Sequence, residues 1–289
     1  MRAWARADLP PSSLVVVGVV NVTPDSFSDG GRFLDPRAAH AHVDRLLAEG
    51  ADVLEIGGES TRPAGADYGA GHASIPAEIQ LARVLPVLRH AVAAAGPRGA
   101  RVAIDTTSPV VARAALAEGV TIVNDVSCLA DPELARVTAE ASGWFVLMHA
   151  RPGATSAYED VVTDVVAEWS RARDRAVAAG LSPDRIVFDP GLGFGKAPSD
   201  SLRLLAALPP LKARLGHPIY VGASRKGLLA FAEERAGLPR SAPSARDPGT
   251  VAVTAHVRAH AHAVRVHDVH GTRQALAVLD AIAAAEEQG

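Results

Sequence analysis

Polar side chains that could bind a ligand follow the short apolar runs of this chain, at the points where predicted strands end. Asp105, Asn124 and Asp189 offer carboxylate and amide groups, and a buried carboxylate can accept two parallel N–H bonds. These three groups could therefore bind the donor and acceptor edge of a flat, nitrogen-rich heterocycle. Arg265 and His267 occupy alternate positions of a predicted strand, so they face the same side and could bind a phosphate or a diphosphate.

The same pattern holds along the whole chain. The residues at predicted strand ends are Asn21, Thr61, Arg62, Asp105, Asn124, His149, Asp189, Lys226, Arg265 and His267. Any one of them could instead cap a helix, form a turn or be a hydrogen-bonded buried group, and for Asn124 and His149 taken alone this simpler interpretation is preferred. A catalytic interpretation of the set therefore depends on a fold that brings the strand ends together.

The order of the predicted elements indicates such a fold. From Leu14 onward, short β-branched runs alternate with longer alanine-rich segments of helical spacing, as in βα units around a parallel sheet. We predict strands at residues 14–20, 52–57, 101–105, 120–124, 144–149, 185–189, 218–222 and 263–267, and helices at 36–48, 76–95, 109–118, from 132, 159–179, 199–208, 250–260 and 271–287. Eight βα pairs fit a closed (β/α)8 barrel, the TIM barrel, better than a doubly wound open sheet, although the periodicity suits both. In this α/β barrel the C-terminal strand ends form one face, where active sites lie.

Composition limits the class of protein. We expect residues 1–289 to form one domain, with 1–13 as a short N-terminal extension, because 48% hydrophobic residues can bury a sizeable core. The net charge of -3 shows no basic excess, so neither nucleic acid nor a membrane is an expected partner. The single Cys128 excludes an intrachain disulfide. No apolar run approaches the roughly 18 residues of a membrane span, and the N-terminus lacks the apolar core of a secretory signal, so a cytoplasmic location is expected.

Two turns add candidate ligand contacts. Asn21 opens the loop NVTPDSFSDGG and supplies a hard oxygen that could hold Mg²⁺, which one neutral ligand would bind weakly unless the ion arrives with the substrate. Phe194, within GLGFGK, could cover an apolar ring, and its flanking glycines would let ligand and backbone approach closely. GLGFGK has no Walker spacing, and a tight strand-to-helix turn is its simpler interpretation. The histidines at 256, 260, 262 and 270 have no acid or cysteine pattern typical of a metal cluster and are expected on the surface.

Eight motifs in order resemble dihydropteroate synthase, a family of pterin-binding (β/α)8 barrels. They are NVTPDSFSDGG at 21–31, GGESTRP at 57–63, IDT at 104–106, IVND at 122–125, LMH at 147–149, DPGLGFGK at 189–196, GASRK at 222–226 and RVHDV at 265–269. The resemblance implies condensation of 6-hydroxymethyl-7,8-dihydropterin diphosphate with 4-aminobenzoate, which gives 7,8-dihydropteroate and pyrophosphate in folate biosynthesis. It also implies that the protein is a cytoplasmic homodimer that uses Mg²⁺.

The resemblance further implies roles for individual residues. Catalytic roles fall to Asn21, Asp105, Lys226, Arg265 and His267. Asp105, Asn124, Asp189 and Lys226 would hold the pterin, with Met148 and Phe194 lining its pocket. Asn21, Thr61, Arg265 and His267 would hold the diphosphate, with Asn21 as the metal ligand. The loops at 22–31 and after Glu59 would close over 4-aminobenzoate with Phe27, Asp29, Arg62, Pro63 and the helix start at Gly227.

The chain departs from the family pattern in three places. Gly227 stands where many members carry serine, so binding of the aminobenzoate carboxylate would rest on backbone N–H groups at a helix start. The fifth loop, MHARPGATSAYED, and the second, PAGADYGAGHASIP, also differ from the usual pattern. Two alternatives stay open: a methyltransferase that passes a methyl group from methyltetrahydrofolate to a corrinoid protein, and a paralogue that binds a pterin without synthase activity.

Overall fold

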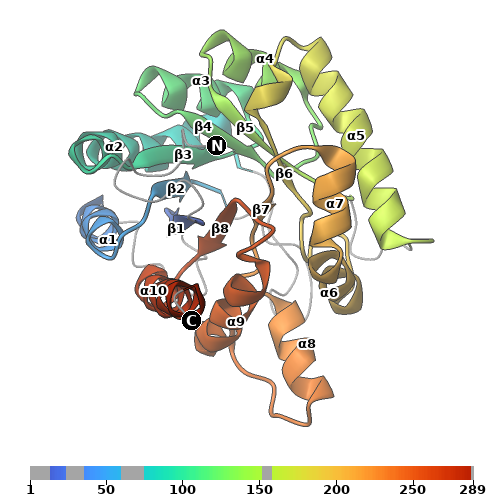
Figure 1. Ribbon diagram of the computed structural model, residues 1–289. Helices are drawn as coiled ribbons and strands as arrows, with labels where there is room; N and C mark the ends of the chain where they lie inside the picture. Colours follow the sequence, from blue (N-terminus) through green and yellow to red (C-terminus); the bar gives the residue numbers. More distant parts are fainter. Residues whose placement is uncertain (1–13, 24–35, 60–74, 152–157, 288–289) are drawn as a thin grey trace.

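In the computed structural model, eight parallel strands form a barrel surrounded by helices (Figure 1). The structure describes residues 14–23, 36–59, 75–151 and 158–287. The predicted N-terminal extension, 1–13, lies outside this part of the chain. Among the predicted site residues, Phe27, Asp29, Thr61, Arg62 and Pro63 also lie outside it.

The strands pair in parallel with their neighbours along the chain, except where β1 pairs with β8. They are β1 (Val15–Asn21), β2 (Val53–Gly57), β3 (Arg101–Asp105), β4 (Ile122–Asp125), β5 (Trp144–Met148), β6 (Ile186–Asp189), β7 (Tyr220–Val221) and β8 (Ala263–Val266). The sheet order is β6-β5-β4-β3-β2-β1-β8-β7. A bridge between Phe188 and Ile219 links β6 to β7, and Phe188 N donates to Pro218 O at 2.8 Å, so the sheet is almost closed. The predicted (β/α)8 barrel is confirmed.

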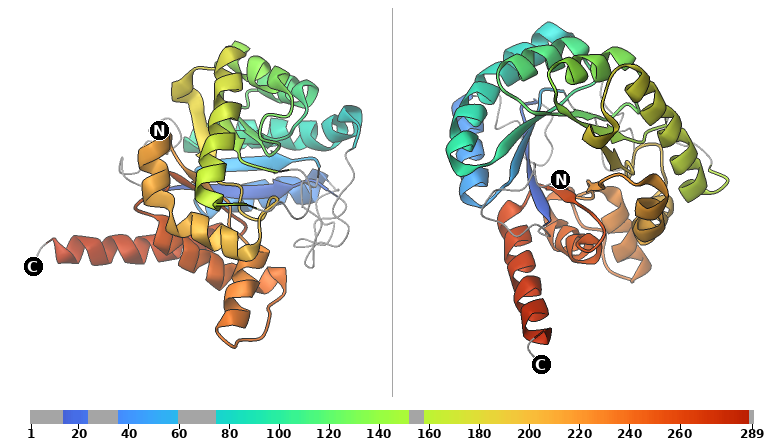
Figure 2. Two further views of the ribbon diagram at one scale, coloured as in Figure 1. Left: turned by 90° about the vertical axis from the view of Figure 1, so that its right-hand side faces the viewer. Right: turned by 45° about the horizontal axis from the view of Figure 1, so that its top comes forward.

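The helices form the outer layer (Figures 1 and 2). They are α1 (Pro36–Ala48), α2 (Ala77–Ala95), α3 (Pro109–Ala117), α4 (Pro132–Glu140), α5 (Val161–Ala178), α6 (Pro198–Ala206), α7 (Leu208–Leu215), α8 (Gly227–Arg235), α9 (Asp247–Val257) and α10 (Val269–Glu286). Local sequence determines where several helices begin. Ser108, just before Pro109 at the start of α3, accepts from Val111 N through its side chain. Asp131 and Asp160 cap α4 and α5 in the same way. In the side view of Figure 2, α10 extends beyond the barrel. Among the described residues, no helix has the length and apolar character to span a membrane.

Several predicted boundaries were wrong, and α9 spans Asp247–Val257 rather than 250–260. One helix was expected at 199–208, but two helices, α6 and α7, meet at Ala207. Pro209 has no N–H to continue α6, whereas a proline in the first turn of a new helix has no intrahelical bond to lose. The seventh strand is shorter than 218–222, and the eighth ends at Val266, so His267 follows the strand.

Two cores result from the alternation of side chains along the strands. One face of each strand packs against the helices, and the other points into the barrel. The barrel interior is filled by Val15, Val17, Val53, Ala103, Ile122, Val146, Val187, Tyr220 and Ala263. Closer to the C-terminal strand ends, the inward positions carry polar residues. These polar residues therefore lie above the packed apolar interior of the barrel.

Candidate active site

Strand register brings the polar strand-end residues together. Across β1 to β4, Asn21 pairs with Gly57, Gly57 with Asp105, and Asp105 with Asn124. Gly57 leaves space in this row, since a Cβ there would lie 3.6 Å from Asp105 Cβ and 3.7 Å from Asn21 Oδ1. On the other side of the barrel, Met148 of β5 pairs with Asp189 of β6. Side chains from five strands therefore share one end of the barrel.

Asp105 and Asn124 present buried acceptors to this end. Asp105 Oδ1 and Asn124 Oδ1 are both buried, and neither has a hydrogen-bond partner among the described residues. Burial, reinforced by the charge of Glu55 and opposed by that of Arg265, raises the pKa of Asp105 to about 7. The charge of Arg265 therefore offsets only part of the effect of burial and of Glu55 on this carboxyl group.

Asp189 is a second buried carboxylate. Its Oδ1 accepts from Gly191 N at 2.7 Å. Burial raises the pKa of Asp189, and Lys226 opposes that shift. Two acids and one amide oxygen together form a surface that suits a ligand with several N–H groups and delocalised positive charge.

Lys226 and Phe194 lie beside the acids. Lys226 Nζ donates to Leu192 O at 2.8 Å and lies 4.7 Å from the centre of the Phe194 ring. Burial lowers the pKa of Lys226 to about 8, against the effect of Asp189. Met148, which is 2% exposed, adds an apolar wall. The side chains predicted for a planar heterocycle thus come from β3 to β7 and their following loops.

The predicted anion site lies at the end of β8. Arg265 Nε donates to Glu55 Oε1, and its Nη2 lies 3.5 Å from Asp105 Oδ2. His267 Nδ1 lies 2.9 Å from Ser224 Oγ, which also accepts from the His267 backbone N at 3.2 Å. Asp268, which follows His267, caps α10 by accepting from Gly271 N at 2.9 Å.

The DPGLGFGK turn is held by a buried lysine. Lys196 Nζ donates to the carbonyls of His149, Gly191 and Phe194 at 3.1, 2.9 and 3.0 Å. Burial lowers the pKa of Lys196 to about 7. Because Lys196 donates to three backbone carbonyls, it holds the turn around Phe194 in place. The interpretation of the motif as a tight strand-to-helix turn is confirmed.

Two histidines have structural roles. His149 is fully buried, and its Nε2 lies 2.9 Å from Glu168 Oε2, so the simpler interpretation of a bonded buried group holds. Burial, reinforced by Lys196, lowers the pKa of His149 to about 4. The expectation of a surface position was wrong for His262, whose Nδ1 accepts from Ile219 N at 2.9 Å between β7 and β8.

Sequence reasoning missed Glu55 and Tyr220. Glu55 lies within β2 and is 1% exposed, and Tyr220 OH donates to its Oε2 at 2.7 Å inside the barrel. The signal was an ionisable residue in the middle of the apolar run VLEIG, where a buried strand seldom carries a charge.

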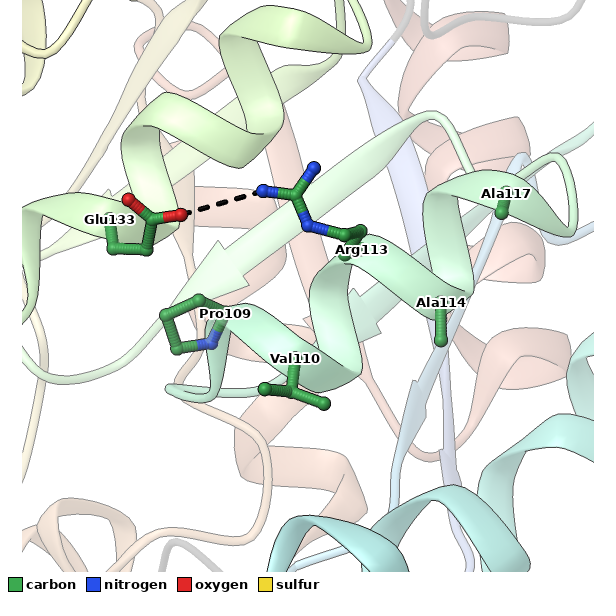
Figure 3. Close-up of a pocket in the computed structure, with 6 residues that line it drawn as sticks. All are labelled: Pro109, Val110, Arg113, Ala114, Ala117 and Glu133. Atoms are coloured by element: carbon green, nitrogen blue, oxygen red, sulfur yellow. Dashed lines mark hydrogen bonds and ion pairs between the residues drawn. The ribbon is translucent and has the colours of Figure 1, made fainter.

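A separate hollow lies on the outer layer, between α3 and α4 (Figure 3). It is lined by Pro109, Val110, Arg113, Ala114, Ala117 and Glu133. Its polar feature is an exposed ion pair, with 3.4 Å between Arg113 Nη2 and Glu133 Oε1. The chemistry needed for a charged heterocycle is therefore found at the strand ends and not in this groove.

Comparisons with known proteins agree with the barrel fold. The family described as "Pterin binding enzyme" matches residues 17–267. Dihydropteroate synthase of Mycobacterium leprae is 44% identical over 274 residues, which cover 92% of both chains. A structure of Xanthomonas albilineans dihydropteroate synthase with 4-aminobenzoic acid has a TM-score of 0.82 at 42% identity and covers 94% of both chains. A structure of that enzyme in complex with 7,8-dihydropteroate has a TM-score of 0.79 at 39% identity and covers 96% of both chains.

The class is therefore a pterin-binding (β/α)8 barrel. Within that class, the chain belongs to the dihydropteroate synthase family.

Proposed function

We propose that this protein condenses 6-hydroxymethyl-7,8-dihydropterin diphosphate with 4-aminobenzoate to give 7,8-dihydropteroate and pyrophosphate. The observation that carries the proposal is a pair of buried acceptors, Asp105 Oδ1 and Asn124 Oδ1, that have no hydrogen-bond partner in the described part of the chain and lie beside Asp189 at the strand ends. A pterin ring carries N–H and amino donors along one edge and would satisfy these atoms. The family relationship supports the same substrate class.

The buried acids also suit the charge that develops in this reaction. The C–O bond between the pterin methylene and the diphosphate breaks, and its electron pair leaves with pyrophosphate. The resulting cation is delocalised into the pterin ring, where Asp105 and Asp189 supply the compensating negative charge. The arylamine nitrogen then forms a C–N bond to the methylene and loses a proton. This path requires stabilisation of charge and no protein nucleophile.

The diphosphate would bind at the end of β8. Arg265 and His267 would contact its oxygens, together with Thr61, and Lys226 would contact the pterin beside Phe194 and Met148. Asn21 would hold Mg²⁺ together with oxygens of the substrate's diphosphate. Among the described residues, no group of three or more His, Cys, Asp or Glu side chains could hold a metal, so a site completed by substrate fits this chain. When bound, the ion would neutralise charge on the leaving group.

The 4-aminobenzoate site would lie over the pterin, at the start of α8. Gly227 is the first residue of α8, and Lys226 before it makes no side-chain capping bond. The N–H groups of Gly227 and Leu228 would receive a carboxylate here, since Leu229 N already donates to Lys226 O at 3.1 Å. Phe27, Asp29, Arg62 and Pro63 complete the proposed site.

Turnover tests the proposal directly. Purified protein with Mg²⁺, the pterin diphosphate and 4-aminobenzoate should form dihydropteroate and pyrophosphate in equal amounts. No product above a protein-free blank would refute the synthase. Pterin binding without turnover would indicate the inactive paralogue, and methyl transfer from methyltetrahydrofolate to a corrinoid protein would indicate the methyltransferase.

A matched pair of variants tests the location of the site. Asp189→Asn should weaken pterin binding at least roughly tenfold, because it removes a buried charged acceptor. Asp44→Asn should leave binding unchanged, since Asp44 lies on α1 and contacts His90 on the exposed outer layer. Equal effects of the two substitutions in a binding titration would contradict the site.

We further propose that the whole chain acts as one unit, as a homodimer in the cytoplasm. The family resemblance supports this assembly. Sedimentation equilibrium should give twice the chain mass of 29.9 kDa, and a monomer at micromolar concentration would contradict the dimer.

A further inference from the structure

Glu55 is a buried acid at the centre of the barrel that contacts two proposed substrate-binding residues. It lies on β2, two residues before Gly57, so it faces inward one step below the row of Asp105 and Asn124. It is 1% exposed. Such a position is costly for a carboxylate unless its oxygens are hydrogen-bonded.

Three donors from three other strands converge on this carboxylate. Glu55 Oε2 accepts from Asn124 Nδ2 at 3.1 Å and from Tyr220 OH at 2.7 Å, while Oε1 accepts from Arg265 Nε. Asn124 belongs to the proposed pterin site and Arg265 to the proposed diphosphate site. One side chain thus holds a residue of each site.

The bond to Glu55 determines which end of the Asn124 amide faces the ligand. An asparagine amide has an acceptor end and a donor end of nearly equal shape, and its hydrogen bonds decide between the two orientations. A carboxylate accepts only, so Asn124 Nδ2 must face Glu55. Asn124 Oδ1 then faces away, and this is the buried atom without a partner among the described residues.

Arg265 is held in a comparable way. Its Nε is bound to Glu55, so the guanidinium plane is fixed and its terminal nitrogens are directed beyond Glu55, with Nη2 3.5 Å from Asp105 Oδ2.

We propose that Glu55 is the positioning residue of this site: it sets Asn124 with its oxygen towards the pterin and holds Arg265 towards the diphosphate. This role rests on the proposed synthase function. Glu55 itself makes no contact with substrate and acts through Asn124 and Arg265.

Two substitutions separate positioning from packing. Glu55→Gln keeps the volume but leaves one acceptor oxygen and adds an NH₂ that must face at least one of the three donors. Glu55→Asp keeps the charge and both acceptor oxygens but loses a methylene and leaves a small cavity. Positioning predicts that Gln weakens binding of 6-hydroxymethyl-7,8-dihydropterin about 10- to 100-fold and more than Asp does. A packing role predicts the opposite order.

A double-variant cycle tests whether Glu55 acts through Asn124. In an Asn124→Ala background, Glu55→Gln should change the pterin Kd less than threefold, because the amide to be oriented is gone. The matched control is Tyr220→Phe, which removes one donor from Glu55 Oε2 without touching Asn124 or Arg265. It should change the pterin Kd by less than threefold.

The diphosphate arm has its own measurement. Glu55→Gln should weaken binding of the pterin diphosphate more than binding of 6-hydroxymethyl-7,8-dihydropterin, because only the diphosphate would contact Arg265. It should also shift the acid limb of kcat/KM to lower pH, since the charge of Glu55 contributes to the raised pKa of Asp105.

Every outcome decides the proposal. Weaker pterin binding by the Glu55→Asp variant than by the Glu55→Gln variant would overturn it. Fully additive effects of Glu55→Gln and Asn124→Ala on the pterin Kd would also overturn it. If Glu55→Gln does not fold by circular dichroism, hydrogen exchange in the unmutated protein decides: Asn124 side-chain amide protons should exchange slowly with water, and fast exchange would overturn the proposal. An unmutated protein that forms no dihydropteroate refutes the proposed function. An active one whose pterin affinity is insensitive to Glu55→Gln refutes only the role of Glu55.

Discussion

Asp105→Asn is expected to make the protein more stable at alkaline pH and less able to bind its substrate. Asp105 is 5% exposed, and its pKa in the folded protein is about 7. An aspartate in an unfolded chain has a pKa of about 3.9. The folded state therefore disfavours the ionised carboxylate, and the substitution removes that cost.

The sign and size of the stability change follow from the difference between the folded and unfolded pKa of Asp105. Because the folded pKa is raised, the cost is absent below the unfolded pKa, grows between roughly pH 4 and pH 7, and is constant above. A difference of three pKa units corresponds to about 4 kcal/mol at pH 8, and about 1 to 2 kcal/mol of it is already present at pH 5. The free energy of unfolding of the variant, relative to the parent, should therefore rise by roughly 2 to 3 kcal/mol from pH 5 to pH 8.

Urea unfolding of both proteins at these two pH values measures the effect. The control is Asp280→Asn on α10, where the carboxylate is 71% exposed and the relative stability should be the same at both pH values. Pterin affinity of Asp105→Asn should fall at least roughly tenfold at pH 8, because a charged acceptor is lost. A variant whose relative stability does not change with pH would show that burial does not disfavour the ionised Asp105 carboxylate in the folded protein.

Three further predictions concern the turn, the base of the barrel and the helix start. Gly191→Ala should abolish folding, since a Cβ there would lie 1.8 Å from His149 O. A Cβ at Gly193 would lie 3.8 Å from its nearest neighbour, so Gly193→Ala should lower the unfolding free energy by only about 1 to 2 kcal/mol, because of the positive φ there. Similar melting temperatures of the two variants would contradict this. Asp52→Ala should cost about 3 to 5 kcal/mol in urea unfolding, because fully buried Asp52 accepts from Val16 N at 2.7 Å and pairs with an arginine. The control Asp174→Ala, which removes an exposed acid, should lower the unfolding free energy by less than about 1 kcal/mol. Equal losses in the two variants would contradict the larger contribution of the buried acid. Gly227→Ser should lower the KM for 4-aminobenzoate about three- to tenfold with little change in kcat, through one added hydroxyl donor; an unchanged KM in steady-state assays would count against a carboxylate at this helix start.

The convergence of the strand-end residues could be predicted because local periodicity indicates alternating strands and helices, and the count of eight βα pairs favoured the barrel over an open sheet. A period of two along each strand decides which residues face inward, and parallel pairing puts Asn21, Asp105 and Asn124 in one row. The exact end of β8 and the break between α6 and α7 depend on where neighbouring segments pair and cap, which periodicity does not specify.

Glu55 could not be assigned a role from the sequence because its partners are distant in the chain. Asn124, Tyr220 and Arg265 lie 69, 165 and 210 residues away. Lys196 shows a related limit: its three acceptors are backbone carbonyls, which carry no signature in residue type. Polar strand ends can be read from a sequence, whereas the buried groups that orient them require the closed barrel.

In the proposed complex, the buried oxygens of Asp105 and Asn124 receive the N–H donors of a pterin. A crystal structure of the protein with pteroic acid tests it most directly. We expect the pterin at the strand ends, with Asp105 Oδ1 and Asn124 Oδ1 each about 3 Å from a ring or amino nitrogen. A pterin bound elsewhere, or bound at the strand ends with both oxygens left to water, would contradict it.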